Sequence, residues 1–177
     1  SNYKTVFFTL GILQIILGIS MVIPILTQII YSELDSSFIG ASIISIVFGF
    51  LFLLSNLNHD KKLNLQKAFL LTALSWLSIA IFGSLPFIFS NLELSITDSF
   101  FESMSGITTT GSTIISNLEV APRSILVWRA MLQWLGGIGI IVMAITLMPI
   151  MNVGGMQLFK ISSNDSSEKL LPKSKEV

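Results

Sequence analysis

The chain has 177 residues, of which 52% are hydrophobic and only 11% are charged, and its mean hydropathy is +0.81. A soluble domain carries roughly a quarter charged residues, so this composition indicates a membrane protein. The formal net charge of zero gives no support to a nucleic-acid partner, and the absence of cysteine excludes disulfides and thiolate metal sites.

Four long apolar segments follow one another along the chain. They span residues 5–32, 36–58, 68–92 and about 125–151, and the last of them is interrupted by Arg129. Each exceeds the roughly 20 residues that a helix needs to cross a bilayer. The first is too long for the apolar core of a signal peptide, which has about 7–15 residues. The sequence therefore predicts four transmembrane helices.

The basic residues predict the orientation of these helices. If the helices alternate in direction, one side receives eight of the ten basic residues: Lys4, Lys61, Lys62, Lys67, Lys160, Lys169, Lys173 and Lys175. The other side receives only Arg123 and Arg129. The positive-inside rule then places both ends of the chain in the cytoplasm. We expect the membrane to be the inner (plasma) membrane. The opposite face would be acidic, with Glu33, Asp35, Glu93, Asp98, Glu102 and Glu119.

The connection between the third and fourth segments contains a short amphipathic helix, ITDSFFESMSGI, at residues 96–107. Ser95 or Thr97 can cap its start, and acidic residues favour its first turns through the helix dipole. Phe100, Phe101, Met104 and Ile107 give it an apolar face at helical spacing, and Gly106 suits its end. At about 1.5 Å per residue such a helix reaches only about half-way across a membrane. We expect it to enter the bilayer and stop there.

The stretch TTTGST directly after this helix begins a loop, residues 108–115, which we call the filter loop. Non-helical backbone at membrane depth is tolerated only in contact with protein or along a water-filled path. Its carbonyl groups can replace the hydration shell of a cation, and the negative C-terminal end of the preceding helix favours a cation too. Alternatively, the hydroxyls join neighbouring helices. The predicted fold is all-α: four transmembrane helices plus a re-entrant pore helix and filter loop.

These residues resemble a known family. The stretches 101–103 and 105–111 resemble the first pore loop of the TrkH/KtrB/HKT potassium-transport superfamily. Trp128-Arg129 and the stretch 133–139 resemble the second helix of that repeat, and the stretch 155–159 resembles the TrkH subgroup. The resemblance covers roughly residues 70–160, and the helix pair before it also fits TrkH.

The resemblance implies potassium uptake, with K⁺ as the transported ion and no cofactor. It makes Thr108, Thr109, Thr110 and Gly111 the carbonyl ligands of K⁺, with the threonine hydroxyls packed behind the loop. Gly111 would occupy the place of the glycine that is associated with potassium selectivity. The implied partners are the remaining pore repeats, a second copy in a homodimer of the full transporter, and a cytoplasmic ring of nucleotide-binding regulatory subunits.

The chain departs from the family in holding one repeat, whereas the family places four around a pore. We expect the N-terminal portion of a longer protein, with an N-terminal helix pair (1–67), a helix–pore loop–helix repeat (68–151) and a cytoplasmic connector (152–177). A homotetrameric channel of this short chain is an alternative. Another is a non-conducting membrane assembly unit in which residues 96–115 form a plug.

Several residues have competing interpretations. Glu102 either braces the filter loop by a hydrogen bond, which we favour, or faces the outer vestibule together with Asp98. Arg129 either extends to the membrane interface or pairs with an acidic residue. Gly136, Gly137 and Gly139 lie in a predicted membrane helix and indicate close helix packing rather than a nucleotide loop. Asp98 and Glu102 share a helical face without a histidine or metal set, so we expect no enzyme.

Overall fold

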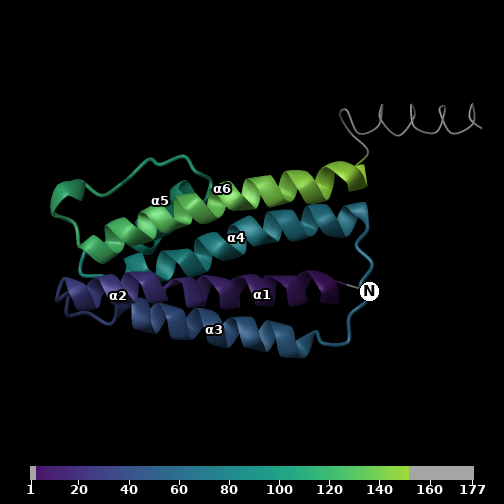
Figure 1. The fold of residues 1–177 in the computed structure, drawn as a ribbon, viewed down its shortest axis with the longest axis horizontal. Helices are drawn as coiled ribbons and strands as arrows, with labels where there is room; N and C mark the ends of the chain where they lie inside the picture. The colour runs from purple at the N-terminus through teal and green to yellow at the C-terminus, as the bar shows by residue number, and fades with distance from the viewer. Residues whose placement is uncertain (1–2, 152–177) are drawn as a thin grey trace, which may run out of the picture. The chain divides into compact units, whose positions relative to one another are not determined.

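The computed structural model describes residues 3–151, and this part of the chain is helical without a strand (Figure 1). The elements are α1 (Lys4–Ser20), α2 (Val22–Ile30), α3 (Ser37–Ser55), α4 (Leu65–Phe89), α5 (Ile96–Ile107), η1 (Leu118–Val120) and α6 (Arg123–Met151). Four helical segments are long and apolar enough to cross a membrane, with α1 and α2 forming the first. The predicted all-α membrane fold is confirmed. The connector at 152–177 and the motif at 155–159 lie outside the described residues.

Residues up to Ile140 form one compact unit, and Ile141 begins a second one. Of the second unit, only the continuation of α6 to Met151 is described. All of the contacts that follow lie within the first unit.

The first span is not one continuous helix. It is broken at Met21, between α1 and α2, and Pro24 explains the break. Proline has no backbone N–H, so the carbonyl one turn earlier, that of Ser20, cannot receive its helical hydrogen bond. The Met21 amide donates instead to the Gly18 carbonyl, at 3.3 Å, which tightens the last turn of α1.

Small residues bring α1 and α3 into close contact. A Cβ on Gly11 would lie 2.7 Å from the Gly49 carbonyl oxygen, and a Cβ on Gly49 would lie 2.7 Å from the Gly11 carbonyl oxygen. Further along, the Ser42 hydroxyl donates to the Gly18 carbonyl at 2.8 Å. Packing of this kind holds membrane helices together where lipid offers no hydrophobic driving force.

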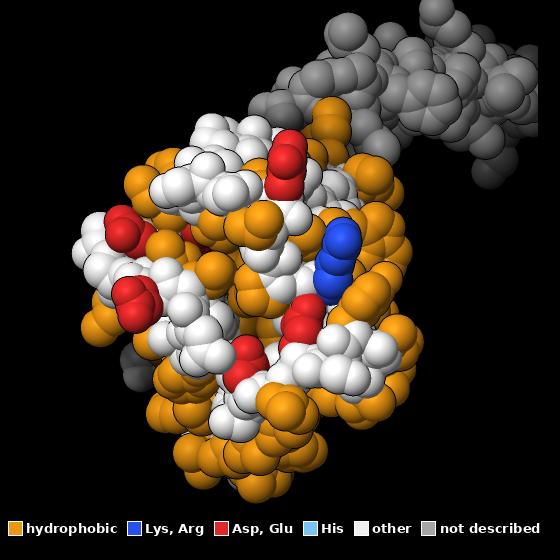
Figure 2. Space-filling model, turned by 90° about the vertical axis from the view of Figure 1, so that its left-hand side faces the viewer, with side chains coloured by type: hydrophobic (Ala, Val, Ile, Leu, Met, Phe, Trp, Pro, Cys, Tyr) orange, Lys and Arg blue, Asp and Glu red, His pale blue; other side chains and the backbone are white. Residues whose placement is uncertain are grey.

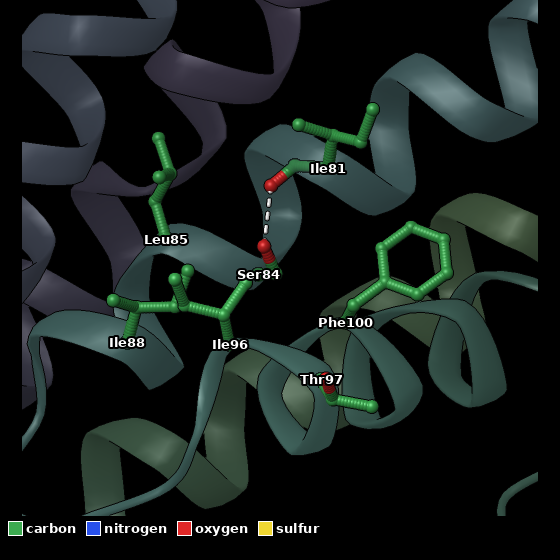
Figure 3. A pocket seen from close by; sticks show the side chains of 7 residues that line it. All are labelled: Ile81, Ser84, Leu85, Ile88, Ile96, Thr97 and Phe100. Carbon is green, nitrogen blue, oxygen red and sulfur yellow. Dashed lines mark hydrogen bonds between the residues drawn. The ribbon is translucent and has the colours of Figure 1, made fainter.

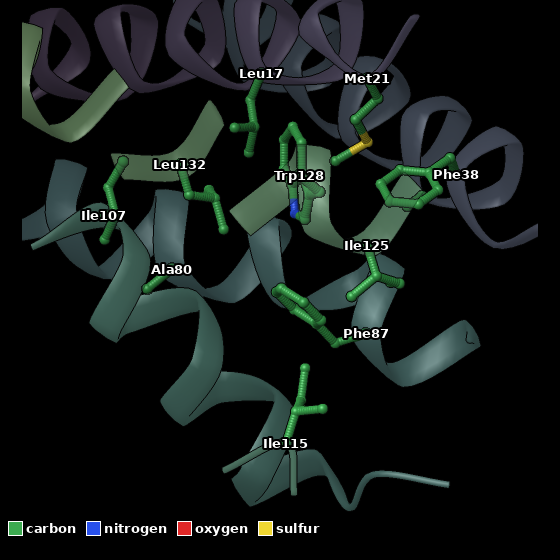
Figure 4. Close-up of a cluster of buried hydrophobic side chains, with 11 residues drawn as sticks. Leu17, Met21, Phe38, Ala80, Phe87, Ile107, Ile115, Ile125, Trp128 and Leu132 are labelled. Atoms are coloured by element: carbon green, nitrogen blue, oxygen red, sulfur yellow. The ribbon is translucent and has the colours of Figure 1, made fainter. Parts of the chain in front are cut away.

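Trp128 of α6 lies at the centre of the buried core (Figure 4). It is fully buried, and its ring meets Phe38 of α3 edge-on, with centroids 6.0 Å apart at an interplanar angle of 76°. Its indole N–H donates to the Gly83 carbonyl of α4 at 2.9 Å. Trp128 therefore joins α3, α4 and α6, whereas Trp134 of the same helix is 65% exposed.

The short helix forms over Ile96–Ile107 as the sequence predicts. Of its predicted apolar face, Ile107 is buried in the core and Phe100 and Met104 pack against that core, whereas Phe101 does not. Small and polar residues are buried along it, namely Ser99, Glu102, Ser103, Ser105 and Gly106, together with Ile107, and Phe101 of the predicted apolar face is 46% exposed. Close approach to α4 and α6 is the reason. A Cβ on Gly83 would lie 2.7 Å from the Ser103 hydroxyl, and one on Gly106 would lie 2.9 Å from the Leu132 side chain. In a membrane, large apolar side chains can face outward while small ones line the contact.

Candidate functional site

The end of α5 is a Schellman motif that turns the chain into the filter loop. The Thr110 amide donates to the Ser105 carbonyl at 3.0 Å, and the Thr109 amide donates to the Gly106 carbonyl at 2.9 Å. Such a motif requires a left-handed residue just past the helix, and glycine usually supplies it. Here Thr109 supplies it, with φ +59°. Gly106 lies in the last turn of α5, one residue before the helix ends at Ile107, and it packs against Leu132.

Replacing Thr109 by glycine is expected to stabilise the protein. The left-handed conformation costs a residue with a Cβ about 1–2 kcal/mol, and this cost exceeds the roughly 0.4–1 kcal/mol that glycine adds through the unfolded chain. Thr110 provides the matched control, because its φ is not positive and Thr110→Gly should only destabilise. Thermal midpoints of the two purified variants test this, and a lower midpoint for Thr109→Gly would contradict the assigned backbone conformation.

The filter-loop amides point back at α5. Those of Thr109, Thr110 and Gly111 donate to the Gly106 or Ser105 carbonyls at 2.9–3.2 Å. In a trans peptide the carbonyl of one residue points opposite to the amide of the next. The carbonyls of Thr108, Thr109 and Thr110 therefore point away from α5. Within residues 3–151 these three carbonyls accept no hydrogen bond, and the loop around them is exposed.

The hydroxyls of Thr108 and Thr110 are used within the loop and its helix. The Thr108 hydroxyl donates to the Met104 carbonyl at 2.7 Å and lies 2.8 Å from the Thr110 hydroxyl. Ser105 adds a further contact, since its hydroxyl donates to the Ser112 carbonyl at 2.6 Å. This role of Ser105 is not predicted by the sequence analysis. The hydroxyls of Thr108 and Ser105 thus hold the loop on α5, while the carbonyls of Thr108–Thr110 remain free of hydrogen bonds among the described residues.

Glu102 braces the other side of the loop. Its carboxylate is buried and accepts hydrogen bonds from the Thr113 hydroxyl and from the amides of Ile114 and Ile115, the last at 3.3 Å. One oxygen, Oε1, receives all three bonds. The loop is therefore fixed on both sides of its turn. The carbonyls of α5 accept the amides up to Gly111, and Glu102 accepts the amides that follow. The geometry agrees with the bracing role rather than with a side chain facing an outer vestibule.

Arg129 of α6 completes this arrangement. Its Nε lies 3.1 Å from the second carboxylate oxygen of Glu102, so Arg129 pairs with an acidic residue rather than extending to the interface. Its Nη2 lies 3.4 Å from the Gly111 carbonyl oxygen. The Arg129 side chain is only 14% exposed, and that of Glu102 is not exposed. Charges buried in this way must be paired, because an isolated one is very costly.

Gly111 has φ +79°, a conformation that residues with side chains rarely adopt. Among the described residues, a Cβ placed on it would meet only the Gln133 side-chain nitrogen, at 3.7 Å. Conformation rather than lack of space therefore requires glycine here. The turn at Gly111 separates the three free carbonyls from the segment that Glu102 holds.

Comparison with known proteins matches this chain to a family. A family model described as "TrkH: Cation transport protein" matches residues 34–176. The chain belongs to the TrkH family. The family is one of transporters rather than enzymes.

Several relatives of this TrkH-family chain are potassium uptake proteins by name. The Trk system potassium uptake protein TrkI of Halomonas elongata is 43% identical over 93% of this chain, and TrkH of Escherichia coli K12 is 39% identical over 90%. The crystal structure of the potassium transporter TrkH from Vibrio parahaemolyticus superimposes with a TM-score of 0.83 at 34% identity, covering 88% of this chain. The chain spans about a third of the length of each of these relatives.

Asp98 is also a predicted site residue of this TrkH-family chain. Among the described residues, its side chain makes no hydrogen bond or ion pair with the loop or with Arg129. Its amide donates to the Ser95 hydroxyl at 3.1 Å, which identifies Ser95 as the cap of α5. Its carboxylate lies one turn before that of Glu102. Figure 2 shows acidic side chains around the end of the molecule where α6 begins. Glu33, Asp35 and Glu102 at this end accept hydrogen bonds from neighbouring backbone.

The three glycines of α6 differ in their surroundings in this TrkH-family chain. A Cβ on Gly136 would overlap the Ile107 carbonyl, lying 2.7 Å from its carbon, whereas one on Gly137 or Gly139 would meet nothing within 4 Å among the described residues. Close packing is thus confirmed for Gly136 alone. It places the backbone of α6 directly on the end of α5, beside the residue that precedes Thr108.

A cavity of about 340 Å³ lies between α4 and α5 (Figure 3). Apolar side chains line most of it, and its polar residues are Ser84 and Thr97. The Ser84 hydroxyl donates to the Ile81 carbonyl of its own helix. The cavity offers no charged group to a cation. Within residues 3–151 no cluster of three or more His, Cys, Asp or Glu residues could hold a metal ion either.

Proposed function

We propose that this chain supplies the first selectivity-filter unit of a potassium uptake transporter. The observation that carries the proposal is the direction of the filter-loop backbone. Amides 109–111 are turned back onto α5, so that the carbonyls of Thr108, Thr109 and Thr110 are free to replace the water shell of a dehydrated K⁺. Gly111 is the fourth proposed ligand, and its carbonyl is the one nearest to Arg129.

The electrostatics of the surroundings support a cation. The C-terminal end of α5 carries the negative end of the helix dipole and stands directly behind the loop. The Arg129 guanidinium is neutralised by Glu102, so its charge opposes a bound cation less than a free arginine would. The acidic side chains at the same end of the molecule would concentrate cations there (Figure 2).

A single loop contributes only part of a ring of ligands. The proposed partners are therefore the remaining pore repeats, in the same chain or in further copies, and the names and lengths of the relatives favour the same chain. By resemblance we add a homodimer of the full transporter and a cytoplasmic ring of nucleotide-binding regulatory subunits. The proposed location is the inner (plasma) membrane, with the N-terminus and the loop 58–67 in the cytoplasm. No catalytic step and no cofactor are part of the proposal.

Replacing Gly111 by serine is expected to lower the preference for K⁺ over Na⁺. The φ of +79° disfavours a side chain by about 1–2 kcal/mol, so the backbone should relax and move the adjacent carbonyls. The measurement is the ratio of K⁺ to Na⁺ uptake by the complete gene product reconstituted in vesicles. We expect the ratio to fall by about tenfold, which corresponds to ~1.4 kcal/mol.

Ser112→Ala is the matched control for this experiment. The Ser112 side chain makes no hydrogen bond among the described residues, and only its carbonyl is used, by Ser105. We expect wild-type selectivity for this variant. Unchanged K⁺ preference in Gly111→Ser would sink the filter assignment, and the absence of any flux in the wild type would favour the non-conducting assembly unit instead.

A further inference from the structure

Glu33 connects the N-terminal helix pair to the pore repeat. It lies in the loop between α2 and α3, and its carboxylate accepts hydrogen bonds from the start of α6, 90 residues later in the chain. The Arg123 amide donates to Oε1 at 2.5 Å, and the Ser124 amide lies 3.3 Å from Oε2. The Ser124 hydroxyl also donates to Oε2. Glu33 thus satisfies the first two amides of α6.

The sequence around the start of α6 has no cap of its own. Pro122 immediately precedes the helix, and its carbonyl accepts the first helical hydrogen bond, from Leu126 at 3.2 Å. A proline side chain offers no acceptor, and no acidic residue lies in the first turn of α6. The first amides of a helix need partners from elsewhere when the capping position cannot supply them. A carboxylate is a favourable partner because it also interacts with the positive end of the helix dipole.

Glu33 is itself held firmly. Its amide donates to the Gln28 carbonyl at 2.9 Å, across a turn in which Ser32 has φ +54°. Two residues later, Asp35 accepts the Ser37 amide at 3.1 Å and the Gln28 side-chain amide at 2.5 Å. The loop is therefore fixed to both α2 and α3, and Glu33 transmits their position to α6.

Two contacts of α6 with the pore helix and its loop depend on where that helix lies along its axis. Arg129 is six residues beyond Arg123, about 9 Å along the helix, and reaches both Glu102 and the Gly111 carbonyl. Gly136, further along, contacts the Ile107 carbonyl. If the start of α6 were not held by Glu33, a shift of the helix along its axis would carry Arg129 away from the filter loop.

We propose that Glu33 is a positioning residue for the filter: it tethers α6 to the N-terminal helix pair and so keeps Arg129 against Glu102 and Gly111. This inference rests on the proposed function of the loop as a potassium filter. It gives the helix pair that precedes the pore repeat a part in ion selectivity.

The test separates a tether from a simple helix cap. Glu33→Ala removes both roles, whereas Glu33→Ala combined with Pro122→Asp restores a cap to α6 from within its own segment. The tether predicts that the double variant regains the membrane abundance of the wild type, yet keeps a ratio of K⁺ to Na⁺ uptake that is lowered by about tenfold. Glu33→Gln, which retains an acceptor oxygen of the same reach, should stay within about threefold of the wild type.

Glu119→Gln is the control for a general loss of negative charge, because Glu119 is exposed and accepts no hydrogen bond among the described residues. It should leave the uptake ratio unchanged. A wild-type ratio in the Glu33→Ala, Pro122→Asp variant would overturn the tether and reduce Glu33 to a cap.

A second measurement does not depend on transport. Hydrogen exchange of amides 110–115 in the complete protein should be faster in the double variant than in the wild type, by about tenfold, because the Glu102–Arg129 pair behind the loop is released. Unchanged exchange there would overturn the inference even if the wild type proved not to conduct potassium. Faster exchange in a protein without potassium flux would instead support the tether and contradict the proposed function.

Discussion

Replacing Glu102 by alanine is expected to be the most damaging single change in the site. It removes the acceptor of the Thr113 hydroxyl and of the Ile114 and Ile115 amides, and it leaves the Arg129 guanidinium buried without its partner. Removal of one member of a buried ion pair costs about 3–5 kcal/mol. Since a typical domain is stable by only about 5–15 kcal/mol, we expect little folded protein in the membrane and no selective potassium uptake.

Milder variants separate the charge of Glu102 from its hydrogen bonds. Glu102→Gln keeps an oxygen that can accept from the loop amides but loses the ion pair, and Arg129→Met removes the other charge. In a double-mutant cycle of these two changes we expect a coupling of about 1–3 kcal/mol, so that the double variant is more stable than the sum of the single effects predicts. Thermal midpoints of the complete protein, converted to free energies, give this number.

Asp98→Asn is the matched control on the same helix. Asp98 lies one turn before Glu102, and its side chain makes no contact with the filter loop or with Arg129. We expect wild-type stability and at most a small change in uptake at low ionic strength, where outer charges attract cations most strongly. Additive effects of Glu102→Gln and Arg129→Met, or an Asp98→Asn variant as damaged as Glu102→Gln, would contradict the assignment of Glu102 as the brace.

Periodicity and composition predict the helices because a helix that crosses a bilayer needs a long apolar segment. Non-helical backbone interrupts such a segment only where its polar groups find other partners. The same rules place α5 at residues 96–107, since its cap and its length are local properties of the sequence. They predict only in part which face of α5 is buried. Hydrophobicity alone does not decide this in a membrane, where Phe101 can face outward and Ser103 inward. The contact between Gly83 and Ser103, which identifies the face packed on α4, is visible only in the structure.

Long-range partners were the other part that the sequence could not specify. The sequence predicts a bracing role for Glu102 and leaves two possibilities for Arg129, but the spacing of 27 residues gives no indication that they meet. Glu33 is counted only as one of several acidic outer residues, because its target amides are backbone groups without a sequence signature. The single hint was Pro122 before α6, which shows that this helix cannot cap itself.

Gly136→Ala is expected to displace α6 from the pore helix. The new methyl group would overlap the Ile107 carbonyl, 2.7 Å from its carbon, and because backbone meets backbone there, no side-chain rotation can relieve the overlap. Overpacking of this kind costs about 1–3 kcal/mol, and the roughly 1 kcal/mol that alanine gains over glycine in a helix offsets only part of this cost. Ile107 immediately precedes the first filter carbonyl, so the K⁺ to Na⁺ uptake ratio should fall even at temperatures where the protein stays folded.

Gly137→Ala is the matched control for Gly136→Ala. Both changes add one methyl group to the same helix and gain the same helix propensity, but a Cβ on Gly137 meets nothing within 4 Å among the described residues. We expect a thermal midpoint at or slightly above that of the wild type for Gly137→Ala, and a lower midpoint with weakened selectivity for Gly136→Ala. Equal midpoints and equal uptake ratios for the two variants would show that α6 does not rest on the end of α5. The Arg129 contact with the filter loop would then lose its support, because the same helix carries both residues.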